Sequence, residues 1–112
     1  PKSWRNLDIA IFEKEKVRDS LLKDEYIAIP PKVVVEVDTK ADLKKHGDVI
    51  HYINEKTDDL LGSGVERVIW VLTKERKVMV AEKSKRWFIT DWDDEINYIE
   101  NIKFSINQLL KA

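Results

Sequence analysis

Two apolar stretches with a helical pattern between them dominate the middle of the chain. Residues 33–37 are four valines interrupted by Glu36, a β-branched run typical of a strand buried on both faces. Apolar residues recur at helical spacing in residues 49–61, and residues 65–72 form a second strand-like run. A strand, a helix and a strand in this order predict a crossover that makes the two strands parallel.

Shorter patterns on either side of this unit predict the rest of the fold. The expected elements are a strand at 7–12, a surface loop with one or two helical turns at 13–25, alternating strands at 77–81 and 86–90, a last irregular strand at 96–106 and a terminal helix at 107–111. Together they predict an α/β domain whose mixed β-sheet has one crossover helix and C-terminal antiparallel strands.

Composition narrows the class of protein. With 112 residues, 43% hydrophobic and 37% charged, the chain is expected to form one domain, residues 1–112, with one core. Its net charge of −1 provides no overall field for nucleic acid, so any such affinity must come from a local patch. The chain has no cysteine, which excludes disulfides and thiolate metal sites and fits a cytoplasmic protein. No apolar run is long enough to cross a membrane.

Glu36 stands where the hydrophobic pattern and the chemistry conflict. A carboxylate inside a buried strand is unfavourable unless it is paired, and a metal ion is one of the few groups that can pair with it. Strand periodicity places Asp38 and Lys40 on the same side as Glu36. We therefore expect function at this strand.

Two other residues fit the same chemistry. Asp8 is either a second carboxylate embedded in an apolar strand or a solvated residue at the start of that strand. Lys56 lies three residues after Ile53 and four before Leu60, within the apolar stripe of the predicted helix. Its side chain either extends to the edge of the helix or directs its ammonium at an internal anion.

Metal-dependent cleavage of a phosphodiester requires carboxylates to hold Mg²⁺ or Mn²⁺ and a lysine beside the phosphate. Asp8, Glu36 and Asp38 are the candidate metal ligands. The lysine is either Lys56 or Lys40, which completes the acid-x-lysine triplet of residues 38–40. Each residue alone also has an ordinary structural explanation, but together they favour a site.

Four segments carry a resemblance to a known family. They are residues 7–11 (LDIAI), 31–37 (PKVVVEV), 56–71 (KTDDLLGSGVERVIWV) and 104–110 (FSINQLL). In order and spacing, the chain resembles the uncharacterised restriction-endonuclease-like proteins of the PD-(D/E)XK nuclease superfamily. The resemblance covers nearly the whole chain.

The resemblance implies roles for individual residues. Asp8 and Glu36 would correspond to the two metal-binding acids, and Lys56 to a lysine that has moved from the second strand to the following helix. Asp38 departs from the pattern, because a strict motif has lysine there; it would be a further ligand. Family members also carry elements before the first acid, and we expect this chain to lack them.

The expected function is that of a Mg²⁺- or Mn²⁺-dependent endonuclease that hydrolyses DNA. The alternative is an inactive member of the same fold that binds nucleic acid or forms a homodimer. Loss of metal binding on substitution of Glu36 would distinguish the first from the second.

Overall fold

The computed structural model describes residues 7–22, 29–38, 49–99 and 102–111. The elements, in chain order, are β1 (Ile9–Ile11), α1 (Lys14–Leu22), β2 (Val33–Asp38), α3 (Val49–Gly62), β3 (Arg67–Leu72), β4 (Lys77–Glu82), β5 (Phe88–Asp91), β6 (Ile96–Ile99), β7 (Ile102–Phe104) and α4 (Ile106–Lys111). Within these ranges, no helix has the length and apolar character needed to span a membrane.

The main sheet has five strands in the order β1-β2-β3-β4-β5. Strands β2 and β3 are parallel, with Glu36 opposite Trp70, and the other neighbouring strands are antiparallel. The predicted crossover and the antiparallel strands that follow it are therefore confirmed. The domain is mixed α/β, with a mixed five-stranded sheet and a second sheet of two strands, β6 and β7.

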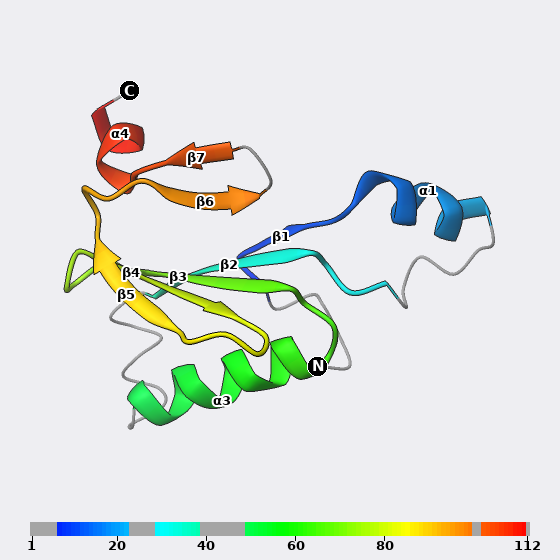
Figure 1. The fold of residues 1–112 in the computed structure, drawn as a ribbon, viewed down its shortest axis with the longest axis horizontal. Helices are drawn as coiled ribbons and strands as arrows, with labels where there is room; N and C mark the ends of the chain where they lie inside the picture. Colours follow the sequence, from blue (N-terminus) through cyan, green and yellow to red (C-terminus); the bar gives the residue numbers. More distant parts are fainter. Residues whose placement is uncertain (1–6, 23–28, 39–48, 100–101, 112) are drawn as a thin grey trace.

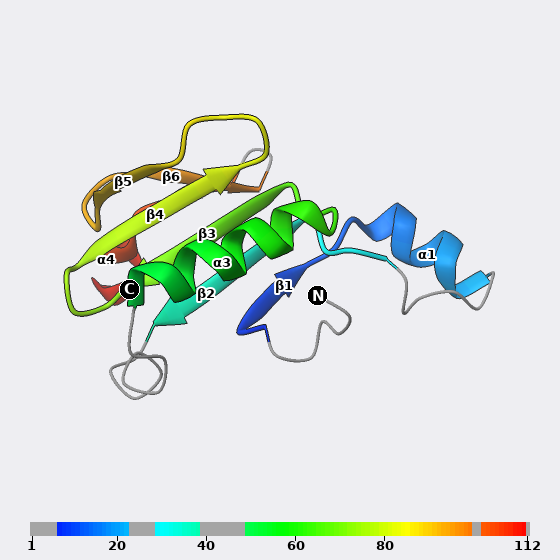
Figure 2. The same ribbon diagram turned by 90° about the horizontal axis from the view of Figure 1, so that it is seen from below.

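The main sheet is covered on both faces. Helix α3 lies along one face, and β6, β7 and α4 lie over the other (Figures 1 and 2). Because side chains alternate along a strand, β2 contributes Val33 and Val35 to one apolar cluster and Val34 to the other. Glu36 follows Val34 by two residues and so lies on the α3 face.

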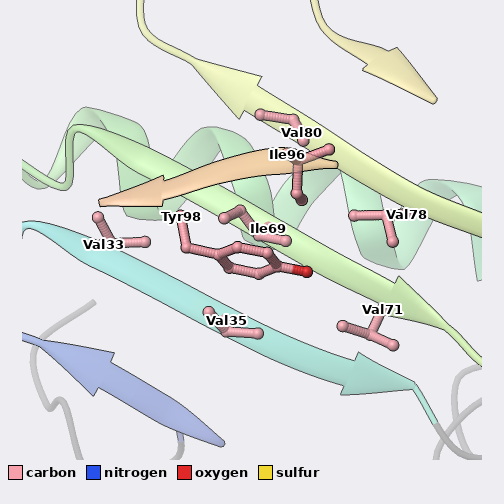
Figure 3. Close-up of a cluster of buried hydrophobic side chains, with 8 residues drawn as sticks. All are labelled: Val33, Val35, Ile69, Val71, Val78, Val80, Ile96 and Tyr98. Carbon is pink, nitrogen blue, oxygen red and sulfur yellow. The ribbon is translucent and has the colours of Figure 1, made fainter. Parts of the chain in front are cut away.

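The core between the two sheets is apolar. Figure 3 shows its buried side chains, which are Val33, Val35, Ile69, Val71, Val78, Val80, Ile96 and Tyr98. Tyr98 stacks on Phe104 of β7, with ring centroids 3.9 Å apart. Burial raises the pKa of Tyr98 to about 12, so its hydroxyl stays protonated at neutral pH.

Two segments differ from their predicted form. Residues 14–22 form the nine-residue helix α1, longer than the predicted turns, because lysine, glutamate, arginine and leucine all favour helix; α1 extends away from the main sheet (Figures 1 and 2). Residues 96–106 contain two antiparallel strands rather than one. Their apolar residues continue to alternate after the chain reverses, so the pattern alone does not reveal the turn.

The link from α3 to β3 depends on Gly64. Its φ is +107°, and a Cβ there would lie 2.9 Å from Cγ of Pro30. The Val65 amide donates a hydrogen bond to the Leu60 carbonyl, which closes the helix. The Glu66 amide then donates to the Lys32 carbonyl, so β3 begins directly beside β2.

Strand β5 forms one edge of the main sheet, and an acidic turn caps part of it. The Trp92 amide donates to the Arg76 carbonyl on the β4 side, so the backbone groups of Asp91, one residue earlier, face away from β4. The Asp91 amide donates to Oδ2 of Asp94, at 3.3 Å. The Asp91 carbonyl accepts a hydrogen bond from the Asp94 amide.

Candidate functional site

Glu36 forms a buried ion pair beneath α3. Only 3% of its surface is exposed, because it points from a central strand of the sheet towards the helix. Lys56, on the sheet-facing side of α3, places its Nζ 3.0 Å from Oε1 of Glu36. Of the two sequence-based alternatives for Lys56, the structure supports an ammonium directed at an internal anion.

Asp8 reaches the same site from the neighbouring strand. It immediately precedes β1 and is exposed. Of the two sequence-based alternatives for Asp8, the structure therefore supports a solvated residue at the start of the strand rather than a carboxylate embedded in it. The Cα pairing of β1 with β2 reaches only as far as Ile9 and Val35. Beyond this point, Oδ2 of Asp8 accepts a hydrogen bond from the Val37 amide, at 2.7 Å. The Asp8 carboxylate thus takes the place of the backbone carbonyl that β1 would offer to Val37 if the two strands were still paired there.

The charges of these three side chains influence one another. Burial raises the pKa of Glu36; the nearby Asp8 carboxyl raises it further, whereas Lys56 opposes the increase. Burial alone would lower the pKa of Lys56, but its ion pair with Glu36 outweighs burial and raises it. Lys56 is therefore held in its charged form.

Two aromatic rings complete the surroundings of Lys56. Its Nζ lies 5.9 Å from the ring centroids of both Tyr52 and Trp70, within the range of a cation–π contact. The Tyr52 ring meets Trp70 edge-on, at 6.1 Å. Trp70 is itself held in place, because its Nε1 donates a hydrogen bond to Oγ1 of Thr57, at 2.8 Å.

Sequence reasoning missed both aromatic residues. Tyr52 precedes Lys56 by four residues on a predicted helix, so helical spacing could have identified it. Trp70 is a neighbour only through the register that places it opposite Glu36. That register emerges only when the two parallel strands are aligned.

The remaining candidates are only partly described by the structure. Asp38 is the last residue of β2, but its side chain lies outside the description, as does the whole of Lys40. The structure therefore brings together Asp8, Glu36 and Lys56, and leaves the predicted roles of Asp38 and Lys40 untested.

Among the described residues, Asp8 and Glu36 could provide two carboxylate ligands for a Mg²⁺ or Mn²⁺ ion. Nowhere in the described ranges do three or more His, Cys, Asp or Glu residues form a group able to hold a metal ion. Asp8 accepts a hydrogen bond from the Val37 amide, next to Glu36 in the chain, and its carboxyl raises the pKa of Glu36. Carboxylate oxygen is the donor that these hard cations prefer. One or two carboxylates, with water and phosphate oxygens, suffice for Mg²⁺ in many phosphate-handling sites.

Two cavities lie on the opposite face of the main sheet. They have volumes of about 310 and 560 Å³, and both are lined by Arg67, Glu82 and Asn97. Neither is lined by Asp8, Glu36 or Lys56. The acid–lysine cluster is thus separate from these cavities.

No protein-family model matches the chain, and no curated protein matches it. Functional inference therefore rests on the cluster of two carboxylates and one lysine.

Proposed function

We propose that this domain is a metal-dependent nuclease that hydrolyses DNA phosphodiester bonds, with a restriction-endonuclease-like core. The observation that carries the proposal is the convergence of Asp8, just before β1, Glu36 in β2 and Lys56 in α3. The Glu36–Lys56 ion pair alone would not require the second acid, which also accepts a hydrogen bond from the Val37 amide. Metal-dependent phosphodiester cleavage, by contrast, uses two acids and a lysine.

The topology supports the same assignment. The first acid precedes a strand antiparallel to β2, the second acid lies within β2, and the lysine follows on the crossover helix. These are the positions implied by the resemblance in residues 7–11, 31–37 and 56–71. The strand that follows the helix pairs in parallel with β2.

In this proposal each residue has a distinct role. Asp8 and Glu36 would hold Mg²⁺ or Mn²⁺, which supplies charge stabilisation and activates water for attack on phosphorus. Lys56 contributes a fixed positive charge for a phosphate oxygen. Its ammonium is already oriented by Glu36 and the two aromatic rings, so it need not reorganise when DNA binds.

The first test is a calorimetric titration with Mn²⁺. We expect the wild-type domain to bind Mn²⁺ and the Glu36→Gln variant to lose this binding, because the neutral amide is a poor ligand for a hard cation. The matched control is Glu75→Gln, which makes the same change in an exposed turn and should bind as the wild type does. A plasmid-nicking assay with Mn²⁺ then tests cleavage by the same three proteins.

Two results would contradict the proposal. Absence of Mn²⁺ binding by the folded wild-type domain would remove the metal site. Equal binding by wild type and Glu36→Gln would place the metal elsewhere.

One observation favours a second candidate function, an inactive relative that binds nucleic acid or forms a homodimer. Glu36 is already neutralised by Lys56 and is almost fully enclosed, as expected of an ion pair kept only for structure. In that case DNA binding or dimerisation would persist in Glu36→Gln, and Mn²⁺ would have no effect on either.

A further inference from the structure

We propose that Tyr52 is a positioning residue for Lys56, which keeps the lysine ammonium at the site when the Glu36 carboxylate turns to a divalent cation. This inference rests on the proposed function, because only a metal site places two cations in competition for Glu36. It assigns a role to a residue that neither the acid–lysine pattern nor the resemblance includes.

Lys56 and a bound divalent cation would compete for the Glu36 carboxylate. Glu36 is the acid paired with Lys56, at 3.0 Å, and it is also a candidate metal ligand. An oxygen that coordinates a divalent cation is a weaker acceptor for an ammonium group, because the ion withdraws its charge. Lys56 therefore needs a second anchor if it is to stay in place.

The aromatic rings beside Lys56 provide that second anchor. Tyr52 lies one helical turn before Lys56 on α3, and its ring centroid is 5.9 Å from Nζ. Trp70 lies at the same distance on the sheet side, so the two rings flank the ammonium without using Glu36.

Tyr52 can be substituted with less damage to the fold than Trp70. Trp70 is 2% exposed and belongs to the core beneath α3, so its substitution would disturb the fold. Tyr52 is half-buried on the surface of α3. It is held edge-on against Trp70, which fixes the direction of its ring.

The experiment measures how readily Lys56 reacts. Wild type, Tyr52→Leu and Tyr52→Phe are treated with limiting formaldehyde and a borohydride reagent at neutral pH, with and without Mn²⁺. Methylation of Lys56 is quantified by peptide mass spectrometry relative to Lys74, an exposed lysine in the turn after β3. Ile50→Ala is the control on the same helix, because Ile50 is 74% exposed.

We expect Tyr52→Leu to raise the Lys56-to-Lys74 ratio roughly threefold to fivefold, the population change that one exposed cation–π contact supports. Tyr52→Phe keeps the ring, so its ratio should stay close to that of the wild type. Ile50→Ala should also leave the ratio unchanged. In Tyr52→Leu, Mn²⁺ should raise the ratio further than it does in wild type.

An unchanged ratio in folded Tyr52→Leu would overturn the inference. If Tyr52→Leu does not fold, an unchanged ratio in Tyr52→Gln, which also removes the ring, overturns it instead. The metal-free arm is independent of the nuclease proposal. If the ratio rises but calorimetry detects no Mn²⁺ binding, the metal site is rejected and the contact between Tyr52 and Lys56 is retained. If calorimetry detects Mn²⁺ binding but the ratio does not change, only the role of Tyr52 is rejected.

Discussion

At the scale of single residues, Glu36 and Lys56 differ in their access to water. The Lys56 side chain is 22% exposed, whereas that of Glu36 is 4% exposed. Removing one member of a buried pair is harmful mainly because the other is left charged and unpaired. The lysine can be hydrated if it loses its partner, but the glutamate cannot.

This difference predicts unequal effects of two substitutions on stability. At about pH 8, Lys56→Met should lower the free energy of unfolding by about 3 kcal/mol. Glu36→Gln should change it by less than about 1 kcal/mol. Urea unfolding followed by tryptophan fluorescence measures both.

The effect of pH on Lys56→Met has a definite sign. The pKa of Glu36 is raised in the folded protein, and loss of Lys56 raises it more, so the folded state binds the proton more tightly than the unfolded state does. Stability linked to Glu36 therefore increases as the pH falls through this raised pKa. The destabilisation should therefore shrink as the pH is lowered; a pH-independent loss would mean that Glu36 is not the group left unpaired.

At the scale of elements, the passage from α3 to β3 provides a paired test at two glycines. A Cβ at Gly64 would contact Pro30 at a φ that side chains disfavour, whereas a Cβ at Gly62 would have no atom within 4 Å. Gly64→Ala should lower the free energy of unfolding by about 1–3 kcal/mol. Gly62→Ala should be neutral or stabilising by about 0.5 kcal/mol. Thermal unfolding of both variants checks this, and equal effects would show that the left-handed φ at Gly64 is not required.

The elements around the site could be predicted from the sequence more fully than the positions of the site residues. The valines of β2 and the helical stripe of α3 were sufficient to predict both elements and to place Lys56 within the apolar stripe. They left open whether its ammonium extends to the edge of the helix or points at an internal anion, because that choice depends on the partner across the sheet. Asp8 could not be placed, because a carboxylate one residue before a strand has the same pattern as one inside it. Its contact with the Val37 amide spans 29 residues. Local pattern carries no information on such a contact.

At the scale of the whole molecule, Arg67 joins the two sheets. Its guanidinium, at the start of β3, donates hydrogen bonds to the Asn97 carbonyl of β6 and to Glu82 of β4. Glu82 also pairs with Lys85, at 3.0 Å. One side chain therefore connects the face opposite α3 to β6.

This network predicts a second dependence on pH. The pKa of Glu82 is lowered, chiefly by its hydrogen bond with Lys85 and further by Arg67, so its stabilisation is present above the usual glutamate range and is lost as the pH falls through the lowered pKa. Glu82→Gln should reduce stability by about 1 kcal/mol at neutral pH. The difference from wild type should disappear in acid. Urea unfolding at both pH values tests this against Glu66→Gln, an exposed control; a loss that persists in acid would assign the effect to packing.

The acidic turn at the end of β5, which contains Asp94, affects the tendency of the protein to aggregate at high concentration. Phe88 and Ile89 on this edge are 50% and 60% exposed, and an apolar edge of this kind invites a strand from another molecule to add to the sheet. With both backbone groups of Asp91 occupied by Asp94, only Ile89 in β5 still presents an outward amide and carbonyl. Added strands usually pair over three or more residues, so the acidic turn that ends β5 disfavours growth of the sheet from this edge.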